Sequence, residues 1–453
     1  MKISFENADK VNGVMTLTIE AEDYKENVEK KLKDYRKKAN MPGFRPGMVP
    51  MGLIKRQYGN AIKVDEINKI LGENIYKYVK DNNIKMLGEP LPSEKQEPQD
   101  LEKDGPFEFV FDIAVAPDFT IQLTDKDKIT YYDIQVDDQL IDGQVDMFAS
   151  RNGHYDKVEE FDPEKRDMLK GDLRQLDAEG NTLEDGITVA DAVLMPQYIK
   201  VDEQKELFQG AKLGDIIVFN PKKAYPESDT EVAALLKLKK EEVADLNDDF
   251  SYQITEISRF VKSEVNQELF DEVFGPGAVS SEEEFRSKIA DGIKGQLAVE
   301  ADMQFLADVR KYAEDKVGEL VFPEEILKRV MKNNNKEKDE KYVEDNFEGS
   351  IKYLKWHLIK EQLVAANNIR IDDNELKGTA MEMARAQFAQ YGMNDVPDEY
   401  LENYAQDILK NKEYTDSIID RTIDRKLIAV LKNVVKLNTK KVSMEEFRNI
   451  GQE

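Results

Sequence analysis

Gly43-Phe44-Arg45-Pro46-Gly47-Met48-Val49-Pro50 is the stretch of this 453-residue chain that says most about its fold. Together with Pro42, it places two glycines and three prolines within nine residues. Proline lacks a backbone N–H and glycine weakens regular structure, so this stretch cannot lie inside a helix or a strand. We predict a constrained, protruding loop between two helices that presents Phe44 and Arg45 outward. Such a pair suits a surface made of protein and RNA together, because a ring can fill a pocket and a guanidinium can bind phosphate or carboxylate. An ordinary helix–helix connector is the alternative.

The loop lies in a basic part of an acidic protein. Residues 24–63 hold eleven Lys and Arg against three Asp and Glu, a net charge of +8 in a chain whose net charge is −27. An anionic partner such as nucleic acid could bind this segment while the acidic remainder is repelled. A solvated helix face is the plainer explanation.

Alternation and helical spacing around the loop predict one sheet with helices packed on it, spanning roughly residues 1–117. Strands are expected where apolar residues alternate, at 15–19 and 107–115. One helix is expected to start at Asp23 as its N-cap and to stop near Asn40, and a second helix is expected to follow Ala61. The apolar helix positions are Tyr24, Val28, Leu32, Tyr35, Ile67, Ile70, Leu71 and Tyr78.

Three further regions follow, which makes the fold class α+β, multidomain and elongated. Residues 118–155 read as an extended linker with a short strand near 129–132 and a helix from Asp137. Residues 156–262 read as a small β-rich domain, with a hairpin-like turn at 177–181 and a strand at 216–219. Residues 263–453 read as all-α. Their helices are expected after a capping box at 281–284 and at 345–366, 372–391, 397–411 and 414–436.

Composition removes several function classes. The chain has no cysteine and only two histidines, His154 and His357, so thiolate chemistry and histidine-rich metal sites are excluded. No phosphate-binding loop of the GxxxxGK[ST] kind is present, and we expect neither a nucleotide nor any other cofactor. With 92 acidic residues, no carboxylate pair is informative. We expect a cytoplasmic protein, since neither an apolar run of membrane-spanning length nor a secretory h-region is visible.

The loop resembles the ribosome-docking signature of the trigger factor family, in which Gly-Phe-Arg, a glycine and a proline precede an Arg-Tyr-Gly-like helix end. The matching residues here are Gly43, Phe44, Arg45, Gly47, Pro50, Arg56, Tyr58 and Gly59. The sequence departs from the signature at Pro46, where lysine is common, and at Gln57. The resemblance extends over essentially the whole chain, including Phe274-Gly275 and Phe322-Pro323. It implies a docking domain (1–117), a linker (118–155), an FKBP-like domain (156–262) and helical arms (263–453).

This resemblance implies a ribosome-associated, ATP-independent chaperone that binds nascent and unfolded polypeptides. The expected ribosome-binding residues are Gly43, Phe44, Arg45, Gly47, Pro50 and Arg56. The partners would be protein and rRNA near the exit tunnel, with no membrane, and a weak homodimer when the chain is free. Met381, Phe388 and Tyr391 on one helical stripe are candidates for client binding, and the alternative is that the stripe is arm core.

The FKBP-like domain raises a second possible activity, peptidyl-prolyl isomerisation. An aromatic pocket can favour the twisted amide without any nucleophile. The Ile-Pro-Gly-aromatic turn usual in working domains is replaced by Ile199-Lys200-Val201-Asp202-Glu203-Gln204, and Tyr198, Phe219 and Tyr225 are weak candidates for the pocket. Alternatively the domain is a spacer or a client contact. A chaperone of ribosome assembly, or of periplasmic folding, is the remaining possibility.

Overall fold

The computed structural model describes residues 1–7, 9–45, 47–393 and 396–450. The chain forms two compact units. The first comprises residues 1–132 and 301–440, and the second comprises residues 133–300 and those from 441 onward. We describe each unit by itself.

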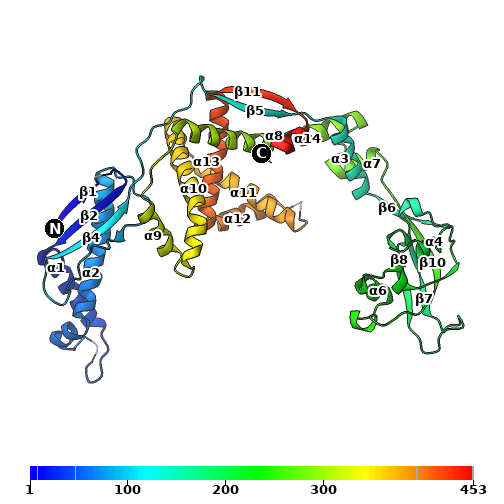
Figure 1. Cartoon of the computed structure of the whole chain (residues 1–453), viewed down its shortest axis with the longest axis horizontal. Coiled ribbons are helices and arrows are strands. Elements are labelled where there is room, and N and C mark those ends of the chain that lie inside the picture. Colours follow the sequence, from blue (N-terminus) through cyan, green and yellow to red (C-terminus); the bar gives the residue numbers. More distant parts are fainter. Residues whose placement is uncertain (8, 46, 394–395, 451–453) are drawn as a thin grey trace. The chain divides into compact units, whose positions relative to one another are not determined.

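The first unit begins with an antiparallel sheet in the order β1-β2-β4-β3 (Figure 1). Its strands are β1 (Lys2–Glu6), β2 (Asn12–Ile19), β3 (Leu91–Pro92) and β4 (Phe107–Ala114). The alternating residues Met15, Leu17 and Ile19 are fully buried, and they share a core with Ile67 and Leu71 of helix α2. The predicted sheet covered by helices is therefore confirmed. Its two helices are α1 (Ala21–Lys38) and α2 (Met51–Asp81).

Two predicted helix starts are wrong. Helix α1 begins at Ala21, and the side chain of Asp23 accepts a hydrogen bond from the backbone N of Glu20 at 2.8 Å. Asp23 thus completes a capping box instead of being the N-cap. Helix α2 begins at Met51, ten residues before Ala61, with Pro50 as its N-cap. Proline is tolerated there because the first N–H groups of a helix have no intrahelical partner.

The rest of the first unit is mainly helical, with a two-stranded sheet. It contains the second half of α8 (Glu282–Val317), then α9 (Glu324–Asn334), α10 (Glu340–Ala366), α11 (Asp373–Gln390), α12 (Asp398–Ile408) and α13 (Lys412–Val434). The four predicted helices after residue 344 match α10 to α13 within a few residues. The last one was expected to reach residue 436, but the chain turns there into strand β11 (Lys436–Val442), which pairs with β5 (Lys128–Ile134).

Helices α10 and α13 are joined by an apolar core and an ionic contact. Trp356 of α10 packs in one cluster with Leu427 of α13 and Phe305 of α8. One turn along α10, Lys360 Nζ lies 2.5 Å from Asp420 Oδ1 and 2.9 Å from Asp424 Oδ1. Burial disfavours the charged ammonium, but the two carboxylates outweigh this effect, and the pKa of Lys360 is raised.

The second unit holds a five-stranded antiparallel sheet in the order β6-β10-β7-β8, with β9 also paired to β10. Its strands are β6 (His154–Val158), β7 (Met168–Gln175), β8 (Thr188–Leu194), β9 (Ile216–Phe219) and β10 (Phe250–Val261). Its short helices are η1 (Pro163–Lys165), η2 (Pro196–Tyr198), α4 (Asp202–Glu206), α5 (Pro221–Ala224), α6 (Asp229–Leu236) and η3 (Lys240–Glu242). The predicted turn is confirmed, since Asp177 N donates to Asn181 O at 2.8 Å.

A second, helical cluster completes this unit. Helices α3 (Asp138–Arg151) and α7 (Gln267–Phe274) pack around Phe285, at the start of α8. The helix predicted from Asp137 is α3, and Asp137 is its N-cap, since its side chain accepts a hydrogen bond from Leu140 N at 2.9 Å. A short helix, α14 (Met444–Ile450), ends the described chain. Across the described ranges, we find no helix with the length and apolar character that crossing a membrane requires.

Candidate functional site

Residues 39–50, which we name the Pro/Gly loop, connect α1 to α2 at one end of the N-terminal sheet domain (Figure 1). Gly43 and Gly47 adopt φ angles of +88° and +82°, a left-handed conformation that side-chain-bearing residues rarely adopt. Two turns shape the loop, because Phe44 N donates to Met41 O at 3.1 Å and Met48 N donates to Arg45 O at 2.9 Å. Pro46, the departure from the expected signature, lies outside the described residues.

The base of the Pro/Gly loop is anchored in a small core of its own. Val49 is fully buried and belongs to one apolar cluster with Leu32, Ile54 and Ile62. This core holds the two helices that border the loop. The loop therefore has a fixed attachment while its outer residues reach solvent.

The outer part of the loop exposes apolar and cationic groups together. Phe44 is 40% exposed and Met48 is 71% exposed, and Arg45 is exposed as well. No described residue forms an ion pair with Arg45. Leu53, in the first turn of α2, is 41% exposed and adds to this surface. Met48 and Leu53 were not predicted as site residues, although Met48 stands inside the quoted motif.

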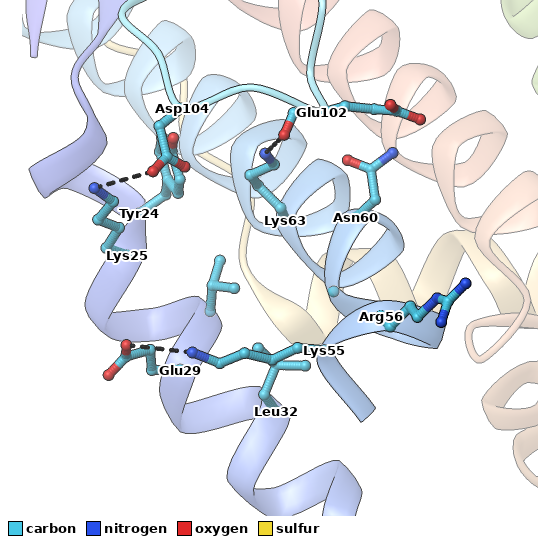
Figure 2. A pocket seen from close by; sticks show the side chains of 12 residues that line it. Tyr24, Lys25, Glu29, Leu32, Lys55, Arg56, Asn60, Lys63, Glu102 and Asp104 are labelled. Carbon is cyan, nitrogen blue, oxygen red and sulfur yellow. Dashed lines mark hydrogen bonds and ion pairs between the residues drawn. The ribbon is translucent and has the colours of Figure 1, made fainter. Parts of the chain in front are cut away.

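Part of the positive charge next to the loop is already neutralised. A cleft of about 600 Å³ lies between α1, α2 and residues 102–104, and Figure 2 shows its lining. Lys25 pairs with Asp104 at 3.3 Å, and Lys55 lies 3.9 Å from Glu29. Arg56 has no such partner among the described residues, and it points away from α1 in Figure 2. Arg45 and Arg56 are thus available to an external anion, together with three exposed lysines of α1 that also lack an ion pair among the described residues, Lys30, Lys33 and Lys38.

The buried lysine of the cleft has a structural task. Lys63 Nζ donates to the backbone oxygens of Glu102 and Lys103 at 3.3 and 3.1 Å, as the dashed line to Glu102 in Figure 2 indicates. The side chain therefore ties residues 102–103 to α2. It is not free to bind a ligand unless these contacts break.

The three weak isomerase candidates do not come together. Tyr198 and Tyr225 both line a groove of about 460 Å³ beside β8 and α6. Phe219 does not line it, because its ring is buried against Phe208 and Tyr252, at centroid distances of 5.3 and 6.3 Å. Burial raises the pKa of Tyr225 to about 12. Its hydroxyl therefore stays neutral near pH 7 and cannot act as a base.

The client-binding candidates of the helical arms divide between packing and exposure. Met381 packs against the core of α11, α12 and α13, and the Phe388 ring lies 5.3 Å from that of Tyr404. Tyr391, just after α11, is 75% exposed. Tyr400, which the sequence reasoning missed, is 66% exposed on α12. Tyrosine is common both inside and outside proteins, so no local pattern marks it as exposed.

Comparisons with known proteins agree on one family. Residues 1–148 match the family model described as bacterial trigger factor protein, residues 155–262 match the probable trigger factor FKBP-like domain, and residues 301–450 match the probable trigger factor C-terminal domain. The trigger factor of Pelagibacter ubique is 24% identical over 100% of this chain and 90% of its own. That of a Nitratiruptor species is 26% identical, over 84% of this chain and 90% of its own.

A solved structure shares the fold. It was published as "Promiscuous Substrate Recognition in Folding and Assembly Activities of the Trigger Factor Chaperone". Its TM-score is 0.52 at 17% identity, and the match covers 95% of this chain and 99% of the other. The predicted α+β multidomain class, with a β-rich middle and a helical C-terminal region, is confirmed. Because three models of a single family match in succession from residue 1 to residue 450, this chain belongs to the trigger factor family.

Proposed function

We propose that this protein is a ribosome-associated, ATP-independent chaperone that binds nascent polypeptides, and that it docks through Phe44 and Arg45. One observation supports the docking residues most strongly. An exposed ring and an exposed guanidinium, without an ion pair among the described residues, stand on a loop whose base is anchored by buried Val49.

The shape of the Pro/Gly loop favours binding. Its backbone is restricted by Pro42 and Pro50 and held by two turns, so little conformational entropy is left to lose on docking. Phe44, Met48 and Leu53 can bury apolar surface against a ribosomal protein, while Arg45 forms paired hydrogen bonds to rRNA phosphate or to a carboxylate.

The helical arms supply scattered contacts for clients. Tyr391, Met393 and Tyr400 are between 48% and 75% exposed on or next to α11 and α12. Separate contacts of this kind bind unfolded segments weakly, and weak binding permits release without a nucleotide.

Co-sedimentation with vacant ribosomes tests the docking residues. The double variant Phe44→Ala, Arg45→Ala should bind at least about tenfold more weakly, because aromatic and arginine anchors dominate interfaces. Lys25→Ala is the matched control, since it also removes one positive charge, but from a side chain that already pairs with Asp104. Salt should also weaken binding by the parent chain. Equal pelleting of the double variant and the parent would show the assignment to be wrong.

We also infer that the protein is located in the cytoplasm, where ribosomes translate. We infer as well that it forms a weak homodimer when it is not bound to a ribosome. The dimer is measurable by sedimentation velocity of the purified protein across a concentration series. A single monomeric species at every concentration would remove it.

A second candidate activity is prolyl isomerisation, favoured by the groove that Tyr198 and Tyr225 line. An apolar groove can stabilise the twisted amide and lower a barrier of about 18–20 kcal/mol. A protease-coupled assay with a proline peptide, run on the full chain and on Tyr225→Ala, decides this point. A background rate for the parent would remove isomerisation as an activity.

A further inference from the structure

Strand β9 has an open edge. Among the described residues it pairs with β10 and with no other strand, in the register Ile216 to Gln253 and Val218 to Ser251. Ile254 N donates to Asp215 O at 2.9 Å. Since hydrogen bonding alternates along an antiparallel pair, Ile217 and Phe219 are the residues of β9 whose backbone groups face β10. The backbone N–H and C=O groups of Ile216 and Val218 therefore point away from β10, toward the open edge.

The side chains along this edge are apolar. Ile216 is 63% exposed and Val218 is 48% exposed, both on the face of the sheet opposite the core, while Phe219 is buried. Natural sheets usually protect an edge with a charge, a proline or a covering segment. The four residues of β9, IIVF, contain neither a charge nor a proline. The edge thus offers unpaired backbone groups and exposed β-branched side chains in one place.

We propose that β9 binds an extended apolar segment of an unfolded polypeptide as an added strand. Only an extended chain presents N–H and C=O groups at the two-residue spacing that Ile216 and Val218 require. Alternate side chains of that segment would contact the exposed Ile216 and Val218 side chains. Because β9 is only four residues long, each contact is weak and reversible. This inference rests on the proposed chaperone function.

The β9 edge is distinct from the groove of Tyr198 and Tyr225. None of the residues that line that groove belongs to β9. The groove borders β8, which is separated from β10, the partner of β9, by strand β7. A client could therefore bind the β9 edge whether or not the groove acts on prolines.

Val218→Pro tests the proposal in the full chain. Proline removes the N–H that points to the open edge, and an edge strand tolerates it there because that N–H is not in the ladder to β10. Val218→Thr is the matched control, since threonine keeps both the N–H and the β-branch. The probe is a fluorescein-labelled peptide of alternating valine and threonine with lysine at each end, followed by anisotropy. We expect Val218→Pro to weaken binding about tenfold, and Val218→Thr to change it less than about threefold.

A second measurement leaves the protein unchanged. N-methylation of every peptide amide should abolish binding, because it removes all the N–H groups that could pair with β9, whereas N-methylation of alternate amides leaves one edge of the peptide free and should spare binding. Hydrogen exchange should slow at Ile216 and Val218 when the unmodified peptide is added. Equal binding by the fully N-methylated peptide and the unmodified peptide would overturn the proposal, even if Val218→Pro failed to fold.

The remaining outcomes separate this inference from the proposed function. If Val218→Pro dissociates a dimer but leaves peptide binding unchanged, the edge pairs with a second copy and the proposal is overturned. If Val218→Pro binds peptide as the parent does, while the parent pellets with ribosomes and suppresses aggregation, only the inference fails. If the parent neither pellets with ribosomes nor suppresses aggregation, but binds peptide through β9, strand addition is supported and the proposed function fails.

Discussion

Replacing Lys360 with methionine tests whether the ionic contact between α10 and α13 stabilises the helical arms. The Lys360 side chain is 8% exposed, whereas those of Asp420 and Asp424 are 45% and 24% exposed. Methionine retains most of the side-chain volume, so the substitution removes the charge without opening a large cavity. The change leaves two neighbouring carboxylates without their shared cation.

The expected loss in free energy of unfolding is about 2 kcal/mol at neutral pH. Removing one partner from a fully buried pair costs about 3–5 kcal/mol. Here Asp420 is nearly half exposed and stays well solvated, so most of the loss comes from Asp424.

The loss should depend on pH in a defined direction. Burial raises the pKa of Asp424, and Lys360 opposes that rise. Without Lys360, the folded variant holds a proton at Asp424 more tightly than the unfolded chain does. A carboxyl group whose pKa is higher in the folded state stabilises the fold at low pH, and this contribution is lost as pH rises through the folded-state pKa. The deficit of Lys360→Met should therefore be largest near pH 7 and shrink as pH falls toward about 4.

Urea denaturation followed by fluorescence measures this effect. The chain has one tryptophan, Trp356, which is 7% exposed and packs with α13 one turn before Lys360. Lys352→Met is the matched control on the same helix, because its partner Glu348 is 82% exposed and an ion pair so open to solvent adds little to stability. A deficit for Lys360→Met that matches the control, or that is the same at pH 7 and pH 4.5, would refute the reasoning.

Three further substitutions have defined outcomes. Tyr252→Phe removes a buried hydrogen bond of 2.9 Å to Ala192 O and should lower the stability of the β-rich domain by about 1–2 kcal/mol in calorimetry. Arg259→Met leaves the fully buried Asp167 without its two guanidinium hydrogen bonds and should cost about 3 kcal/mol in urea denaturation followed by circular dichroism. Gly43→Ala strains a backbone at φ +88° by about 1–2 kcal/mol, so it should weaken ribosome pelleting several-fold and lower the stability of the N-terminal domain by no more than that amount.

Local patterns were enough to predict the N-terminal sheet and the loop. Strand β2 alternates with period two, and Met15, Leu17 and Ile19 are buried as that period requires. The prolines and glycines between 42 and 50 exclude regular structure by their own covalent geometry. Both signals act within a few residues, which is why they can be read without knowing the fold.

The start of α2 shows where local reasoning fails. Pro50, Gly52 and Gly59 have low helix propensity and argue against a helix in residues 50–60. Burial of Ile54 and Ile62 against Leu32 overrides that preference, and the helix begins at Met51. The stabilising contact comes from another helix, so the segment alone does not reveal it.

Pairing between distant segments was equally out of reach. No periodicity in residues 128–134 or 436–442 indicates that β5 and β11 pair, or that Lys360 meets Asp424. The strand at Ile216–Phe219 was predicted, but its place at an open edge depends on which strand pairs with β10. The basic segment at residues 24–63 was visible in the sequence. Which of its cations form ion pairs, and that Arg45 and Arg56 form none with any described residue, could be seen only in the structure.

The order of synthesis has a consequence for the first unit, because its residues come from both sides of the second unit. Ile129 of β5 is 3% exposed in the finished protein, where it packs with Phe305 and Leu431. During translation β5 leaves the ribosome long before residues 305–442, and its apolar side chains stay exposed to water until these arrive. A growing copy of this protein is therefore itself an unfinished chain in need of shelter, and an earlier copy docked on the same ribosome could provide it.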